Sequence, residues 1–323
     1  MGSFVRVFGA IAARASIHIA AAVLAGVAGL VVVLSPVTSF GGASAESADP
    51  SPVRVAYGSD PFQFGELWLP TPERSPDSDT PVPVVVLIHG GFWRNPYGLE
   101  LMTPLAEDLV ARGVAVWNIE YRRVGDDGGG WPGTMADVAD AIDARAEFDP
   151  DTGAADDATQ NDITADVPFD AVLDVDDVTV VGHSAGGHLA LWSASRQLLP
   201  ADAPGHDPVV RPVRVIGQGP VADLAAAAAD HIGSDAVFGF LGGSIDEYPD
   251  RYAVATPVVV DGVETVVVRG TNDVVVPATY TIPPGGGDVT VIDVEGADHF
   301  DLIDPAGEAW QAVLTAIGLA DRG

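Results

Sequence analysis

Hydrophobic residues in this chain gather in short runs, and longer segments of helical character separate several of them. Eight runs are of strand length, most of them are rich in valine, and several are apolar throughout, as expected for strands buried on both faces of a sheet. The eight runs are Val53–Tyr57, Leu67–Leu69, Val82–Ile88, Val114–Ile119, Val178–Val181, Val213–Ile216, Val266–Val268 and Val289–Val294. The clearest helix-like segments are Leu99–Ala111, Thr134–Glu147, Gly187–Leu198 and Ala306–Leu319. Strands that alternate with helices predict an α/β fold, with a mostly parallel sheet covered by helices on both sides.

The net charge of the chain excludes some classes of binding partner and substrate. The 323 residues include 46 Asp and Glu against 15 basic residues, all of them arginine, which gives a formal net charge of −31. This charge argues against nucleic acid as a partner, because phosphate contacts need lysine or arginine. It also disfavours anionic substrates. The chain has no cysteine, so disulfides, thiolate catalysis and thiolate metal ligands are excluded.

The first 45 residues differ from the rest of the chain. They contain two arginines and no acidic residue, then an uncharged, mostly apolar run from Ala15 to Leu34, and then Ala43-Ser44-Ala45. A basic start, an apolar stretch and a small-x-small site predict a signal peptide that is cleaved after Ala45, and so a secreted or cell-envelope protein. The alternative is an uncleaved membrane anchor, because the apolar run approaches the length of a bilayer span.

An acidic segment interrupts the alternation of strands and helices. Residues 149–177 hold ten aspartates and no basic residue. The spacing of Asp149, Asp151, Gly153 and Asp156 resembles a calcium loop, but glycine occupies one ligand position and the required glutamate is missing. We therefore expect one domain over residues 46–323, with a solvated acidic insertion at about residues 149–168.

The segment Gly182-His183-Ser184-Ala185-Gly186 fits the G-x-S-x-G pattern of a nucleophile elbow. The pattern alone is a modest signal, since a tight turn can contain an incidental serine. The expected strand before it and the expected helix after it strengthen the assignment, because a strand–turn–helix unit exposes the serine hydroxyl above a sheet. Ser184 is therefore the candidate nucleophile.

A second glycine-containing loop follows another expected strand. His89-Gly90-Gly91 comes directly after Val82–Ile88, and its backbone N–H groups can approach a developing oxyanion closely. The N–H of Ala185 would supply a further donor, and we expect His89 to brace the loop. Phe92 and Trp93, and Trp131 after a run of glycines, could line the substrate pocket, although core packing is an equal alternative for Phe92 and Trp93. We expect Gly219–Tyr252 to form helices and a small lid.

The acid and the base of a serine hydrolase follow the serine in the order acid, then histidine, when the sheet is an open α/β sheet. Asp273 and His299 each come shortly after an expected strand, so both could lie beyond the carboxyl ends of the strands with Ser184. Asp250 and Asp261 are the alternative acids. Asp298, Asp301 and Asp304 surround the histidine, but a metal site there would lack a second nitrogen ligand.

Four segments in this order resemble the α/β-hydrolase fold, and in particular its kynurenine formamidase-like and feruloyl-esterase-like branch with an HGGxW motif. They are HGGFW (89–93), GHSAGGH (182–188), GTNDVVVP (270–277) and ADHF (297–300), and the resemblance spans about residues 53–319. It implies Ser184 as nucleophile, Asp273 as acid and His299 as base. It also implies backbone N–H groups of Gly90, Gly91 and Ala185 as oxyanion donors, with no cofactor.

From these features we expect an exported serine hydrolase that cleaves small or aryl carboxylic esters through an acyl-enzyme. A neutral or cationic small molecule is the expected substrate, because the chain is strongly acidic. One alternative is an amidase or formamidase with the same triad. Another is a hydrolase fold without activity that serves as a binding protein.

Overall fold

The computed structural model of the protein describes residues 51–71, 82–144 and 173–320. All of these residues belong to the second of two units into which the chain divides, Met1–Ser47 and Ala48–Gly323. The predicted leader, residues 1–45, and the predicted acidic insertion, residues 149–168, lie outside the described residues. Among the residues that are described, no helix has the length and the apolar character needed to cross a membrane.

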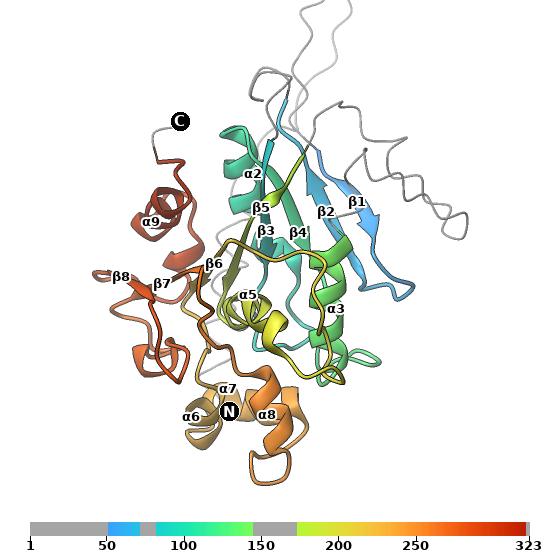
Figure 1. The fold of residues 1–323 in the computed structure, drawn as a ribbon. Coiled ribbons are helices and arrows are strands. Elements are labelled where there is room, and N and C mark those ends of the chain that lie inside the picture. The colour runs from blue at the N-terminus through green and yellow to red at the C-terminus, as the bar shows by residue number, and fades with distance from the viewer. Residues whose placement is uncertain (1–50, 72–81, 145–172, 321–323) are drawn as a thin grey trace, which may run out of the picture. The chain divides into compact units, whose positions relative to one another are not determined.

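A sheet of eight strands forms the centre of the described part of the chain (Figure 1). The strand order is β1-β2-β4-β3-β5-β6-β7-β8. β1 and β2 pair antiparallel, as do β2 and β4, and all other neighbours are parallel. The strands are β1 Val53–Ala56, β2 Phe64–Trp68, β3 Val82–Ile88, β4 Ala115–Ile119, β5 Leu173–His183, β6 Arg214–Gln218, β7 Glu264–Gly270 and β8 Thr290–Val294. The predicted mostly parallel sheet is confirmed, and each of the eight predicted runs contributes to a strand.

Helices lie between the parallel strands, as the sequence predicts. They are α2 Thr103–Ala111, α3 Gly133–Asp143, α5 Ala185–Ser195, α6 Leu224–Ala229, α7 Ile232–Leu241, α8 Pro249–Ala255 and α9 Glu308–Ala316. Short 3-10 turns are η1 Leu99–Leu101, η3 Arg196–Leu198, η4 Ala278–Tyr280 and η5 Asp301–Ile303. The segment Gly219–Tyr252 forms α6, α7 and the first part of α8, so its predicted helices are present.

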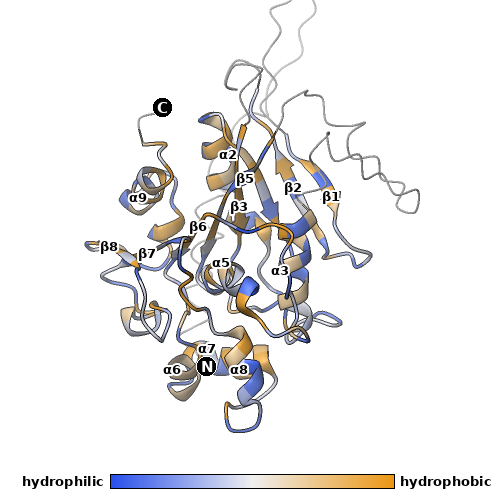
Figure 2. Ribbon diagram, in the orientation of Figure 1, coloured by the Kyte–Doolittle hydropathy of each residue, from blue (hydrophilic) through white to orange (hydrophobic). Residues whose placement is uncertain are grey.

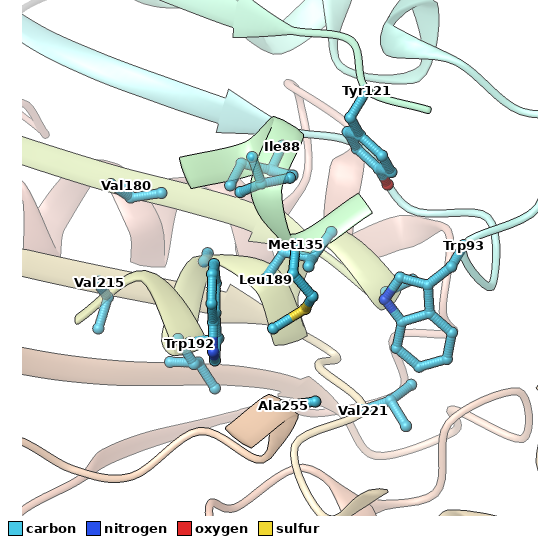
Figure 3. Packing of buried hydrophobic residues seen from close by; sticks show 14 of the residues in the cluster. Ile88, Trp93, Tyr121, Met135, Val180, Leu189, Trp192, Val215, Val221 and Ala255 are labelled. Atoms are coloured by element: carbon cyan, nitrogen blue, oxygen red, sulfur yellow. The ribbon is translucent and has the colours of Figure 1, made fainter. Parts of the chain in front are cut away.

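The sheet separates two hydrophobic clusters, and β3 contributes to both. Its side chains alternate between the faces, so Val85 and Leu87 pack in the cluster that includes residues of α2 and α9. Val86 and Ile88 pack in the cluster that includes residues of α3 and α5. Figure 3 shows Ile88 of this second cluster with Met135 of α3 and Trp192 of α5. Figure 2 shows the corresponding hydrophobic residues along the inner strands. Burial on both faces explains why these strands are apolar throughout.

Strand β5 is longer than its apolar core predicts. Its partner β3 pairs Val82 with Leu173 and then Val84 with Val178, so the register shifts between the two pairs. The shift accommodates an acidic stretch that includes Asp176 and Asp177, both exposed. The carboxyl end of β5 lies next to those of β3 and β6, so the loops that follow these strands gather at one edge of the sheet.

Candidate active site

Ser184 occupies a sharp turn between β5 and α5. Its backbone has φ 57° and ψ −118°, a conformation that strains a residue with a side chain. Glycines on both sides make the turn possible. A Cβ at Gly182 would lie 2.1 Å from the Gly186 carbonyl oxygen, and a Cβ at Gly186 would lie 2.2 Å from the Ile88 oxygen. The Ser184 N–H donates to the Gln218 carbonyl at 2.8 Å, which fixes the turn against β6.

Asp273 and His299 form a buried hydrogen-bonded pair. The Nδ1 atom of His299 lies 2.6 Å from Oδ2 of Asp273, and both side chains are almost fully buried. The other oxygen, Oδ1, accepts hydrogen bonds from the N–H groups of Val275 at 2.9 Å and Val276 at 2.8 Å. The carboxylate is an acceptor, so Nδ1 carries the proton and Nε2 remains available as a base. The alternative acids Asp250 and Asp261 are both exposed.

The pair and the nucleophile meet at the ends of β5 and β6. Gly219 follows β6, and a Cβ added there would lie 3.2 Å from Asp273 Oδ2 and 3.3 Å from His299 Nδ1. The preceding residue is Gln218, whose carbonyl binds the Ser184 N–H. The ring of His299 also contacts the ring of His183, the residue before Ser184, with centroids 4.5 Å apart. The structure therefore brings the three predicted triad residues to one place, and their catalytic roles stay predictions.

Two of the three predicted oxyanion donors, Gly90 and Ala185, lie next to the nucleophile. A Cβ added to Gly90 would lie 3.0 Å from the Ser184 Cβ, so the loop backbone touches the serine directly. Ala185 is the first residue of α5, where a backbone N–H has no partner within the helix and the helix dipole favours negative charge. Gly91 has φ 113°, and a Cβ there would clash with Tyr97 at 2.4 Å. Gly90 and Ala185 are thus adjacent to the serine from two different elements.

A buried ion pair braces the loop that contains Gly90. His89 Nε2 lies 3.0 Å from Glu120 Oε1, and His89 Nδ1 lies 2.8 Å from the Gly90 carbonyl oxygen. The His89 ring also stacks on Tyr121 at 4.4 Å, and the Tyr121 hydroxyl donates to the His89 carbonyl at 2.8 Å. The expectation that His89 braces the loop is confirmed by these contacts. Sequence reasoning missed Glu120 and Tyr121, although a carboxylate directly after a buried strand is a signal that could have identified the first.

Glu120 gathers several donors in a buried position. One oxygen accepts the Tyr121 N–H at 2.9 Å, the other accepts the Leu99 N–H at 3.1 Å, and Arg123 approaches within 3.2 Å. Burial alone would raise the pKa of this carboxyl, but the charges and hydrogen bonds of His89, Arg123 and Tyr121 bring the pKa below its ordinary value. Glu120 is therefore ionised, and it joins the loop after β3 to the loop after β4.

The three aromatic residues predicted for the substrate pocket all lie near α7. Trp93 is fully buried and stacks on Phe240 of α7 with centroids 4.6 Å apart, so the packing alternative describes it. Phe92 is nearly buried, and a Cβ added at Gly233 would lie 2.6 Å from its ring. Trp131 is partly exposed, and its backbone N–H donates to the Phe240 carbonyl at 2.8 Å. A pocket role stays a prediction for Phe92 and Trp131.

No group of three or more His, Asp or Glu side chains suited to a metal ion occurs within residues 51–71, 82–144 and 173–320. This finding includes Asp298, Asp301 and Asp304. Asp298 Oδ1 instead accepts the N–H groups of Phe300 at 2.8 Å and Asp301 at 3.1 Å, while the Asp301 carboxylate accepts the Asp298 N–H at 2.8 Å. These carboxylates therefore shape the backbone around His299.

Comparison with known proteins supports the fold from two directions. The BD-FAE family model matches residues 73–144, a segment that includes the His89-Gly90-Gly91 loop. A comparison with curated proteins finds no match. Many solved structures are similar to the chain.

Three solved structures illustrate the likeness. A truncated form of a carbohydrate esterase from gut microbiota is 18% identical, with a TM-score of 0.61, over 84% of this chain and 96% of that one. Esterase B from Lactobacillus rhamnosis is 21% identical, with a TM-score of 0.59, over 84% and 85% of the two chains. A bifunctional GH43-CE protein of Bacteroides eggerthii is 20% identical, with a TM-score of 0.59, over 84% of this chain but only 37% of its own length. The chain thus has the α/β-hydrolase fold, and its residues 73–144 match the BD-FAE family model.

Proposed function

We propose that this protein is a serine hydrolase that cleaves carboxylic esters with small or aryl acyl groups through an acyl-enzyme. The observation that carries the proposal is the buried hydrogen bond between His299 and Asp273 beside the strained turn of Ser184. The BD-FAE match and the solved esterases of the same fold support the choice of esters.

The proposed reaction uses each group for one task. His299 Nε2 takes the proton of Ser184 as the hydroxyl oxygen attacks the ester carbonyl, and Asp273 stabilises the resulting imidazolium. Backbone N–H groups of Gly90, Gly91 and Ala185 hold the oxyanion, and each such donor contributes on the order of 3 kcal/mol in the transition state. His299 then gives the proton to the departing alcohol. Water hydrolyses the acyl-enzyme with the same histidine as base.

The test is turnover of short-chain p-nitrophenyl esters by the full chain and by its Ser184→Ala variant. Turnover by the wild type that is lost in the variant supports the serine mechanism. Ser193→Ala is a matched control, because Ser193 is a buried serine like Ser184 but lies within α5, where its hydroxyl donates to the Ala190 carbonyl. Full turnover by Ser184→Ala contradicts the proposal. Including N-formylkynurenine ranks esters against the formamidase alternative.

We also propose that residues 1–45 direct export and that the substrate is neutral or cationic, because the remaining chain carries 13 arginines against 46 acidic residues. The mass of the chain recovered from a secreting host tests the first point. A protein that begins at Glu46 supports it, and an intact Met1 contradicts it. A comparison of kcat/KM for cationic and anionic esters at low and high salt tests the second point, because salt screens surface charge.

A further inference from the structure

His183 lies between the nucleophile and the base. It is the last residue of β5, directly before Ser184, and its side chain is almost fully buried. Its ring centroid lies 4.5 Å from that of His299, with the ring planes inclined by 45°. The mechanism proposed above assigns this residue no task.

The hydrogen bond of His183 determines its tautomer. Nε2 lies 2.9 Å from the backbone carbonyl oxygen of His299, and a carbonyl can only accept, so Nε2 carries the proton. Nδ1 is buried without a hydrogen-bond partner in the described part of the chain, as expected for the nitrogen that lacks a proton. The ring therefore donates to the backbone of the base. This bond spans 116 residues of sequence.

A neighbouring side chain holds the same loop in a similar way. Gln218 of β6 pairs with His183 of β5 in the sheet, so the two side chains point to the same face. The Gln218 amide donates to the Leu302 carbonyl, and Leu302 lies in the turn η5 that follows His299. His183 also reaches the oxyanion loop, because a Cβ added at Gly90 would lie 3.1 Å from its Nδ1. The ring thus contacts both loops that complete the site.

We propose that His183 is a positioning residue for His299. Its ring donates a hydrogen bond to the His299 backbone carbonyl and thereby fixes the position of the base relative to Ser184. This inference rests on the proposed function, since it concerns the same site.

A neutral side chain is required at this position, because His299 becomes a cation during the reaction. Burial lowers the pKa of His183 well below its ordinary value, and the neighbouring His299 lowers it further, while the hydrogen bond to the His299 carbonyl opposes this shift. His183 therefore stays uncharged when His299 takes up a proton. The buried histidine at this position thus supplies a hydrogen-bond donor and a planar ring without carrying a charge.

The experiment compares His183→Leu with His183→Gln. Leucine removes the donor, whereas the amide of glutamine can replace it. We expect His183→Leu to lower kcat about tenfold, which corresponds to about 1.4 kcal/mol, with KM changed by less than about twofold. We expect His183→Gln to recover most of the kcat. The second measurement is the downfield proton resonance of the His299–Asp273 hydrogen bond in NMR spectra, which should shift or broaden in His183→Leu and return in His183→Gln.

His188→Leu is the matched control. His188 is equally buried and its Nε2 donates to a backbone carbonyl at 2.8 Å, but that carbonyl belongs to Ala255, far along the chain from the base. We expect this control to leave the His299–Asp273 resonance unchanged. An unchanged kcat and resonance in His183→Leu would overturn the inference, as would the same spectral change in His188→Leu. The resonance needs no substrate, so a wild type that hydrolyses no ester would refute the proposed function without deciding the role of His183.

Discussion

The imidazole of His89 and the carboxylate of Glu120 form a buried pair, 3.0 Å apart, between two loops at the edge of the sheet. His89 precedes the glycine that touches Ser184, and Glu120 directly follows β4. The conformation of the loop that would hold an oxyanion therefore depends on a charge in the next strand-end loop.

Replacing Glu120 by glutamine should destabilise the protein and reduce its activity. The change removes the negative charge of a buried carboxylate that contacts His89, Arg123 and two backbone N–H groups. We expect the free energy of unfolding to fall by about 3 kcal/mol in urea titrations, since breaking a buried pair leaves its partner uncompensated. Glu264→Gln is the control, because the exposed pair of Glu264 with Arg214 should contribute less than about 1 kcal/mol. Equal losses in the two variants would contradict this account.

Replacing Asp273 by asparagine should leave the fold intact and nearly abolish ester turnover. The two backbone N–H groups that hold Oδ1 can still bind an amide oxygen, but the amide nitrogen would then face His299 Nδ1 and favour the wrong tautomer. We expect kcat to fall by about ten-thousandfold, by analogy with other serine triads. The exposed residues Asp250 and Asp261 supply the controls, and their asparagine variants should keep full activity.

Replacing Gly90 by alanine should reduce kcat by about a hundredfold, the effect of losing one oxyanion donor. The added methyl group would lie 2.8 Å from the His183 carbonyl oxygen and 3.0 Å from the Ser184 Cβ, so the loop must move away from the nucleophile. Gly239→Ala in α7 is the control, because its added methyl group meets only Val124 at 3.8 Å. A Gly90→Ala variant with wild-type kcat would remove this loop from the proposed oxyanion site.

Replacing His188 by glutamine should reduce the loss of unfolding free energy that accompanies a fall in pH. Burial lowers the pKa of His188 to about 4, and its hydrogen bond to Ala255 only partly offsets this effect. The unfolded chain takes up the proton near pH 6.5 while the folded chain does not, so stability is lost as the pH falls from about 6.5 toward 4. Between pH 7 and pH 5 we expect this histidine to account for about 2 kcal/mol. Denaturant titrations at both pH values test this, and identical losses in wild type and variant would contradict it.

The sequence alone located the eight strands along the chain, although it missed the first part of β5. Valine-rich runs mark buried parallel strands because both faces of such strands are covered, so burial leaves a local pattern that can be read without the fold. The turn of Ser184 is also marked locally by its two glycines. Gly182 faces the Gly186 carbonyl within the turn, whereas the reason for Gly186 is the Ile88 carbonyl of β3, which only the fold brings close. The G-x-S-x-G pattern, the chain order and the expected strands before Asp273 and His299 together selected the three residues that the structure gathers.

Tertiary structure alone decided the contacts between loops that are far apart in sequence. The pairing of β3 with β4 brings Glu120 to His89, and the pairing of β5 with β6 sets His183 and Gln218 beneath the loop of His299. Packing on Phe240 likewise buries Trp93, which the sequence left open between core and pocket. Such contacts depend on strand order and register, and these follow from the burial of the whole sheet, so no local pattern in the sequence reveals them.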